Sequence, residues 1–296
     1  MRTYRVHPLK RIAKFVWEFY PVFALHALVP TLASAEGLER PLALGWYPLR
    51  LAVSLPLDLP TLEKHFMFSW PALREGRWWT SVTHMLLHRD TRHALSNLES
   101  ALAAGPAVTD AIGVPGAVLC YFFSGVAAAL DPFGFGTLQF ERIFAFKRIG
   151  LAERARRFSR ENLSFELAKV VDRAADAVNE AWKSVSIPSV AQMAQDNARS
   201  FGASGGISAF AAIDACASAV ELLDGRRRDP LSIISAGMHV MSSVRYFARE
   251  WHLIETGECD QIGHGAHLTG ATVGVATYLA FRFWRRTEKH AQWRGG

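Results

Sequence analysis

The chain has 296 residues, of which half are hydrophobic and one fifth charged, and its formal net charge is +6. With only three cysteines, this composition excludes a disordered chain, a collagen-like repeat and a small disulfide-stapled scaffold. The charges are unevenly spread: residues 103–130 and 201–220 contain one charged residue each, and residues 261–281 contain none. Apolar stretches of this length predict membrane-spanning helices, and therefore an integral, multi-pass membrane protein.

The N-terminal segment is basic. Residues 1–14 hold five Lys or Arg and no acidic residue, which fits either part of a mitochondrial presequence or a flank that stays on the inner side of a membrane. A first span is predicted within 15–35. Residues 41–57 are apolar but interrupted by three prolines and an arginine, so we expect an interfacial or re-entrant piece there.

An aromatic-rich interfacial loop is predicted at 58–92, and five further apolar segments follow it. These segments lie at 93–110, 114–133, 203–223, 231–249 and 264–284. The sequence thus predicts an all-α polytopic membrane helix bundle with about six transmembrane helices in a lipid bilayer. The basic residues flank the spans on the predicted inner side, so lipid rather than nucleic acid is the expected partner.

A charged insertion separates the third span from the fourth. Between residues 141 and 199 it holds 11 Lys or Arg and 8 Asp or Glu, too many for deep burial in a bilayer. From Leu167 to Val185 apolar residues recur at three- and four-residue intervals, which predicts an amphipathic helix. We expect this helix to lie at the interface or to cap the outer mouth of the bundle. A solvated helical loop without a catalytic role is the alternative.

Five regions follow from these boundaries. They are the basic N-terminus with the first span and the interfacial segment (1–57), the interfacial loop with two spans (58–135), the charged amphipathic helical insertion (136–200), three C-terminal spans (201–284) and a basic tail (285–296).

Three polar motifs lie at outer ends of predicted spans, on one side of the membrane. The first is Gly202-Ala203-Ser204-Gly205-Gly206, at the start of the fourth span. A serine hydroxyl becomes a good nucleophile when a base takes its proton, and free N–H groups at a helix start favour developing negative charge. The flanking glycines let neighbouring helices approach closely. Ser204 is therefore a candidate nucleophile.

The second motif begins the last span and offers two imidazoles, His264 and His267. Gly270 and Gly274 follow at the small-residue spacing that allows membrane helices to pack closely. Such packing against the helix of Ser204 would bring an imidazole within hydrogen-bonding reach. We therefore expect a histidine of this span to be the general base.

The third motif begins the second span. His93 and Asn97 are four residues apart, so they share one helix face, and His88 precedes them. Polar groups in a membrane bundle are costly and need a reason to be there. Acyl transfer also needs donors for its oxyanion, a role that these side chains can supply.

Together, the motifs resemble the rhomboid intramembrane serine proteases. The resemblance rests on three stretches: Gly202-Ala203-Ser204-Gly205, His93-Ala94-Leu95-Ser96-Asn97 with His88 before it, and Ala266-His267-Leu268-Thr269-Gly270 through Gly274. It implies a six-helix bundle in which a Ser–His dyad cleaves single-span membrane proteins with no cofactor and no metal. It further implies that Ser204 is the nucleophile, that His267 is the base, and that His93, Asn97 and the Ser204 backbone N–H form the oxyanion hole.

A narrower resemblance points to the mitochondrial branch, the presenilin-associated rhomboid-like proteases. It rests on His65-Phe66-Met67-Phe68-Ser69 and on the Gly-Ala-Ser-Gly form of the serine motif, and it implies the mitochondrial inner membrane. Two departures stand out. Many rhomboids have an aromatic residue one turn after the serine, stacked on the catalytic histidine, where this chain has Ser208. The insertion directly before the serine is the other.

Three other classes of protein share some of these sequence features. Gly202 to Gly206 also fits the nucleophile elbow of a soluble α/β hydrolase, but the residues before it are polar and helix-like rather than a buried strand. His84 and His88 could share a metal, but no third ligand is evident. A rhomboid-like scaffold that binds membrane helices without cutting them stays open as the alternative, although such relatives usually lose the serine or the histidine.

Overall fold

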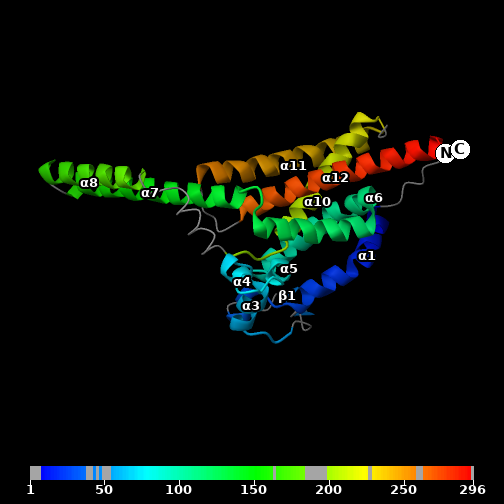
Figure 1. The fold of residues 1–296 in the computed structure, drawn as a ribbon, viewed down its shortest axis with the longest axis horizontal. Coiled ribbons are helices and arrows are strands. Elements are labelled where there is room, and N and C mark those ends of the chain that lie inside the picture. Colours follow the sequence, from blue (N-terminus) through cyan, green and yellow to red (C-terminus); the bar gives the residue numbers. More distant parts are fainter. Residues whose placement is uncertain are drawn as a thin grey trace.

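The computed structural model describes residues 8–37, 43–44, 47–48, 55–162, 165–183, 199–225, 229–257 and 263–294. These residues are mainly helical, and their only strands are the two-residue β1 (Ala43–Leu44) and β2 (Tyr47–Pro48), which pair antiparallel. The fold is an all-α polytopic bundle, as the sequence predicted (Figure 1). The interfacial piece expected at 41–57 lies mostly outside the described residues, as do residues 1–7 of the basic N-terminus.

Six helical segments run back and forth between the two ends of the bundle. They are α1 (Pro8–Leu28), the two arms of α6 (Thr91–Leu130), α10 (Ser204–Leu223), α11 (Pro230–Thr256) and α12 (His264–Arg294). α6 breaks at Gly113, where φ of 76° and ψ of 165° are not helical and Pro115 follows. The chain turns back there, because His93 from the first arm and Ala128 from the second both reach the start of α10.

Three stretches of the described chain are long and apolar enough to cross a membrane: Pro8–Ala35, Thr91–Leu130 and Ser204–Leu223. α11 and α12 have 27 and 31 residues, which is also enough length for a span. The helices extend beyond the predicted spans, since the first begins at Pro8 instead of 15 and the last continues to Arg294 instead of 284. α11 exposes a row of large apolar side chains that lipid can cover: Leu231, Ile234, Met238, Met241 and Val244.

Aromatic side chains of α1 form the centre of the core. Phe15 and Phe19 are buried, and Phe19 packs edge-on against Tyr121 of α6 and Phe210 of α10. Phe15 occupies the space beside Gly105, where an added Cβ would lie 2.1 Å from its ring. Lipid tails are as apolar as these side chains, so close packing rather than exclusion of water holds the helices together.

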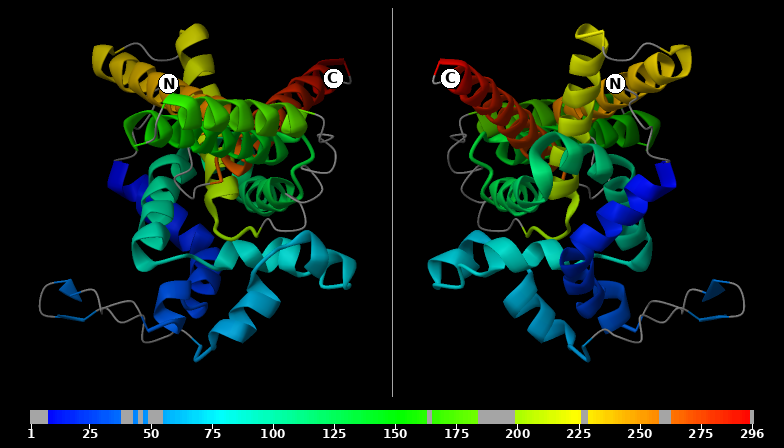
Figure 2. Two further views of the ribbon diagram at one scale, coloured as in Figure 1. Left: turned by 90° about the vertical axis from the view of Figure 1, so that its left-hand side faces the viewer. Right: turned by 90° about the vertical axis from the view of Figure 1, so that its right-hand side faces the viewer.

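The loop between α1 and α6 folds into short helices at one end of the bundle. They are α2 (Leu32–Ala35), α3 (Leu59–Phe66), α4 (Trp70–Arg74), α5 (Thr80–Thr83) and the 3-10 turn η1 (His84–Leu86). Thr31, Asp58 and Ser69 cap α2, α3 and α4 by accepting a backbone N–H three residues on. Figure 2 shows this layer below the bundle in both end-on views.

The insertion is helical; its beginning packs against α11 and α12, and the rest extends beyond the bundle. Helices α7 (Phe135–Asn162) and α8 (Phe165–Lys183) form a hairpin that projects along the long axis, at the end opposite the two termini (Figure 1). Ion pairs of Arg156 and Arg160 with Asp172 join the two helices. The predicted apolar stripe is largely exposed, as at Leu167 and Val170, because α8 packs instead through Ala168 and Ala175. Val185, the last residue of that stripe, lies outside the described residues.

Candidate active site

The three sequence motifs meet at one end of the bundle. Ser204 is the first residue of α10, His267 lies in the first turn of α12, and His93 and Asn97 lie in the first two turns of α6. α10 packs against both neighbours at this level: Gly202 contacts the His93 ring, and Gly205 lies beside Ala128 and the Ala266 carbonyl. The structure therefore brings together the residues that the sequence singled out.

Backbone hydrogen bonds hold the segment that leads into Ser204. Phe68 and Ser200 exchange two of them, at 3.0 and 2.9 Å, and the Gly202 N–H donates to the His84 carbonyl at 2.8 Å. Gly202 has a φ of +104°, and an added Cβ would lie 3.0 Å from the His93 ring. Glycine is thus required here for both conformation and space. The result is a half-buried Ser204 at a fixed helix start.

Glycines set the distance between α10 and α12. A Cβ added at Gly270 would lie 2.0 Å from the Gly205 carbonyl oxygen, and one at Gly274 would lie 2.5 Å from the Ala209 carbonyl oxygen. The two backbones are therefore in direct contact over more than one turn. His267 lies one turn before Gly270, and Ser204 immediately precedes Gly205, so this contact places the two residues at a similar level on neighbouring helices.

The Ser204 hydroxyl makes no hydrogen bond to the His267 ring among the described residues. Hydrogen bonds between a nucleophile and its base often become short only when substrate is bound. The ring of His93 also lies close enough to His267 for the two to interact electrostatically.

His267 is held from α11. Its Nδ1 lies 2.8 Å from Glu250 Oε2 and 3.0 Å from the Tyr246 hydroxyl. When Nδ1–H donates to the carboxylate, Nε2 carries the lone pair that a general base needs. The Tyr246 ring lies 6.1 Å from the His267 ring at 31°, and Ser208 interacts with Tyr246. The aromatic residue beside the histidine therefore comes from α11. The position on α10 where many rhomboids have an aromatic residue is Ser208 in this chain.

His264, the other imidazole of this motif, shares the same carboxylate. Its Nδ1 lies 2.7 Å from Glu250 Oε2, and both residues are buried. The ligand atoms of Glu250, His264 and His267 all lie within 4.8 Å of one another, a two-histidine, one-carboxylate set that could hold a transition-metal ion. Glu250 lies in none of the three sequence motifs. Its spacing of four from Tyr246, which places both on one helix face, was the available signal.

Two unpaired polar atoms belong to residues that line a cavity next to the serine motif. Asn97 Nδ2 and His88 Nε2 are buried and have no hydrogen-bond partner among the described residues. Both residues border a cavity of about 240 Å³ between α1, α6 and α10, which also reaches Ala203. A buried polar atom without a partner costs about 1–3 kcal/mol, so the Asn97 amide is available to donate to an acceptor that enters the cavity. Burial lowers the pKa of His88 to about 3, which keeps this ring neutral.

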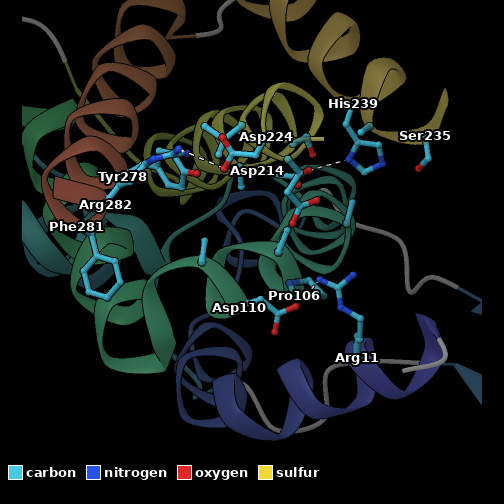
Figure 3. A pocket seen from close by; sticks show the side chains of 18 of the residues that line it. Arg11, Pro106, Asp110, Asp214, Asp224, Ser235, His239, Tyr278, Phe281 and Arg282 are labelled. Carbon is cyan, nitrogen blue, oxygen red and sulfur yellow. Dashed lines mark hydrogen bonds and ion pairs between the residues drawn. The ribbon is translucent and has the colours of Figure 1, made fainter. Parts of the chain in front are cut away.

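A larger cavity of about 660 Å³ lies at the opposite end of the bundle (Figure 3). Two ion pairs line it, Arg11 with Asp110 at 2.5 Å and Arg282 with Asp224 at 3.5 Å, and His239 Nδ1 lies 2.9 Å from Asp214 Oδ2. Asp214 lies ten residues after Ser204, roughly 15 Å along α10. None of the residues predicted for the active site borders this cavity.

Fold and site define a polytopic helical membrane protein in which a serine and a histidine lie at the starts of two neighbouring, glycine-packed helices. The family model of the Rhomboid domain matches residues 75–139, the part that contains His88, His93 and Asn97. This match supports the rhomboid family for the chain. Comparisons with curated proteins and with solved structures give no significant match.

Proposed function

We propose that the chain is an intramembrane serine endopeptidase that hydrolyses peptide bonds of single-span membrane proteins. In this proposal regions 58–135 and 201–284 form the catalytic core, Ser204 is the nucleophile and His267 the general base. The observation that carries it is the backbone contact between Gly205 and Gly270, which brings together the helix starts that carry the two residues. Mutual positioning of nucleophile, base and oxyanion donors is what acyl transfer requires.

The chemistry follows from these positions. Ser204 Oγ attacks the substrate carbonyl carbon while His267 Nε2 takes the hydroxyl proton. The oxyanion accepts hydrogen bonds from Asn97, His93 and the Ser204 backbone N–H at the start of α10. His267 then gives its proton to the leaving amine, and an acyl–Ser204 ester remains. A water molecule, deprotonated by His267, attacks the ester and regenerates the serine.

Substrate class and location extend the proposal. The exposed apolar face of α11 and the apolar helices around the site suit a substrate that is itself a membrane helix. We place the protein in the mitochondrial inner membrane, because residues 65–69 and the Gly-Ala-Ser-Gly form resemble that branch. Protease protection of the tagged protein in purified mitochondria tests the location.

The test of activity uses the full chain in liposomes with a single-span reporter protein. We expect the native protein to release a reporter fragment cut within or next to its span, and Ser204→Ala and His267→Ala to release none. Both variants should bind the reporter as the native protein does. Binding without cleavage by native protein would support the scaffold alternative and overturn the proposal.

A further inference from the structure

One buried carboxylate on α11 is not explained by a Ser–His dyad. Glu250 is 4% exposed, in a bundle where an ionised side chain is costly unless it is paired. Its Oε2 lies 2.8 Å from His267 Nδ1 and 2.7 Å from His264 Nδ1. It therefore contacts the proposed base on the nitrogen that does not receive the serine proton.

That contact has chemical consequences for the base. A carboxylate that accepts from Nδ1–H fixes the tautomer in which Nε2 is unprotonated, and it holds the ring in one orientation. It also stabilises the imidazolium that forms when His267 takes the Ser204 proton. The Tyr246 hydroxyl, 3.0 Å from the same nitrogen, restricts the ring from the same helix.

We propose that Glu250 is a positioning residue for His267, so that the site works as Ser204–His267–Glu250 with its acid supplied by α11. This inference rests on the proposed protease function. The same three side chains could instead hold a metal ion, and the test includes an outcome that distinguishes the two roles.

The test is the rate at which a fluorophosphonate probe labels Ser204, measured against pH with the full chain in detergent. Glu250→Gln keeps size and hydrogen-bonding capacity but removes the charge, and Glu255→Gln makes the same change at an exposed position on α11. We expect Glu250→Gln to lower the rate at neutral pH about a hundredfold or more, and Glu255→Gln to leave it unchanged.

A conservative variant separates positioning from general support of the fold. Glu250→Asp keeps the charge on a shorter side chain, and we expect its rate to lie between those of the native protein and Glu250→Gln. A merely structural role would make the shorter side chain the slower of the two variants. This variant also carries the test if melting shows that Glu250→Gln does not fold.

Each outcome separates the two proposals. If the native protein is not labelled at any pH, the proposed function fails. If the native protein is labelled and Glu250→Gln matches it in rate, the positioning role is wrong and the dyad acts alone. Addition of EDTA should leave native labelling unchanged. A loss that zinc restores would show that the cluster is a metal site, and would also overturn the positioning role.

Discussion

Replacement of Gly270 by alanine should inactivate the protein by separating two helices. The new Cβ would lie 2.0 Å from the Gly205 carbonyl oxygen, whereas ordinary contact begins at 3.4 Å, so the backbones must part by about 1.4 Å. Gly205 belongs to helix backbone and cannot turn aside as a side chain could. Overpacking of this kind costs about 1–3 kcal/mol, which should leave the bundle folded.

The effect on catalysis should be larger than the effect on stability. α12 carries His267 one turn before Gly270, so a shift of α12 moves the base away from Ser204. A misplacement of about 1 Å between reacting groups typically costs roughly a hundredfold in rate. We therefore expect the labelling rate of Gly270→Ala to fall by about that factor.

The assay is single-turnover labelling of Ser204 by a fluorophosphonate, with thermal melting alongside. Gly237→Ala is the matched control, because it lies in α11 and an added Cβ there meets nothing within 4 Å. It should label at the native rate and melt at or slightly above the native temperature. If Gly270→Ala labels as fast as Gly237→Ala, the glycine contact does not set the dyad, and the reasoning fails.

Further predictions concern the donors, the base, the loop and the insertion. Asn97→Ala should lower turnover of the reporter about a hundredfold, roughly 3 kcal/mol in the transition state, with little change in its binding; a change in binding alone would make Asn97 a packing residue. His267→Ala should abolish labelling, while His264→Ala should keep most of it; the reverse pattern would exchange their roles. Burial lowers the pKa of His84 to about 4, so the neutral ring is favoured in the folded state. The contribution of neutral His84 to the free energy of unfolding is complete above about pH 6.5 and falls by about 3 kcal/mol as pH drops to 4. The melting temperature of the native protein should therefore decrease more steeply over this pH range than that of His84→Gln. A short flexible linker in place of 141–195 should preserve labelling of Ser204 and broaden the range of substrates cut. It retains Gln139, whose Oε1 accepts from the Gly265 N–H at 2.9 Å, and loss of labelling in a folded protein would make the insertion part of the catalytic structure.

The helices could be predicted because their signal is local. Apolar runs of span length predicted all six segments, and the turn expected between the second and third falls at Gly113. The helix ends were less predictable. α12 continues through basic residues to Arg294, because charged residues end a membrane span but do not end a helix. The course of α8 was also not predictable, because its pairing with α7 depends on ion pairs between the two helices, and such pairs leave no periodic signal in the sequence.

Some residues of the candidate site could be predicted from the sequence and others could not. Ser204, His267 and Asn97 could be found because each lies in a short motif at a helix start. Glu250 and Tyr246 could not, because they meet His267 only through the packing of α11 on α12. In sequence, Glu250 is one of several acids near the end of a span. Only the fold shows that it is buried and that its oxygen faces two imidazoles.

The central claim is that Ser204 is a nucleophile activated by the residues around it. Its most direct test is peptide mapping by mass spectrometry after the native protein, in lipid, reacts with a fluorophosphonate. We predict one phosphonylated residue, Ser204, with no adduct after the protein is unfolded before reaction or when Ser204 is replaced by alanine. An intact, folded protein that carries no adduct at Ser204, or equal labelling of Ser204→Ala at another residue, would contradict the account.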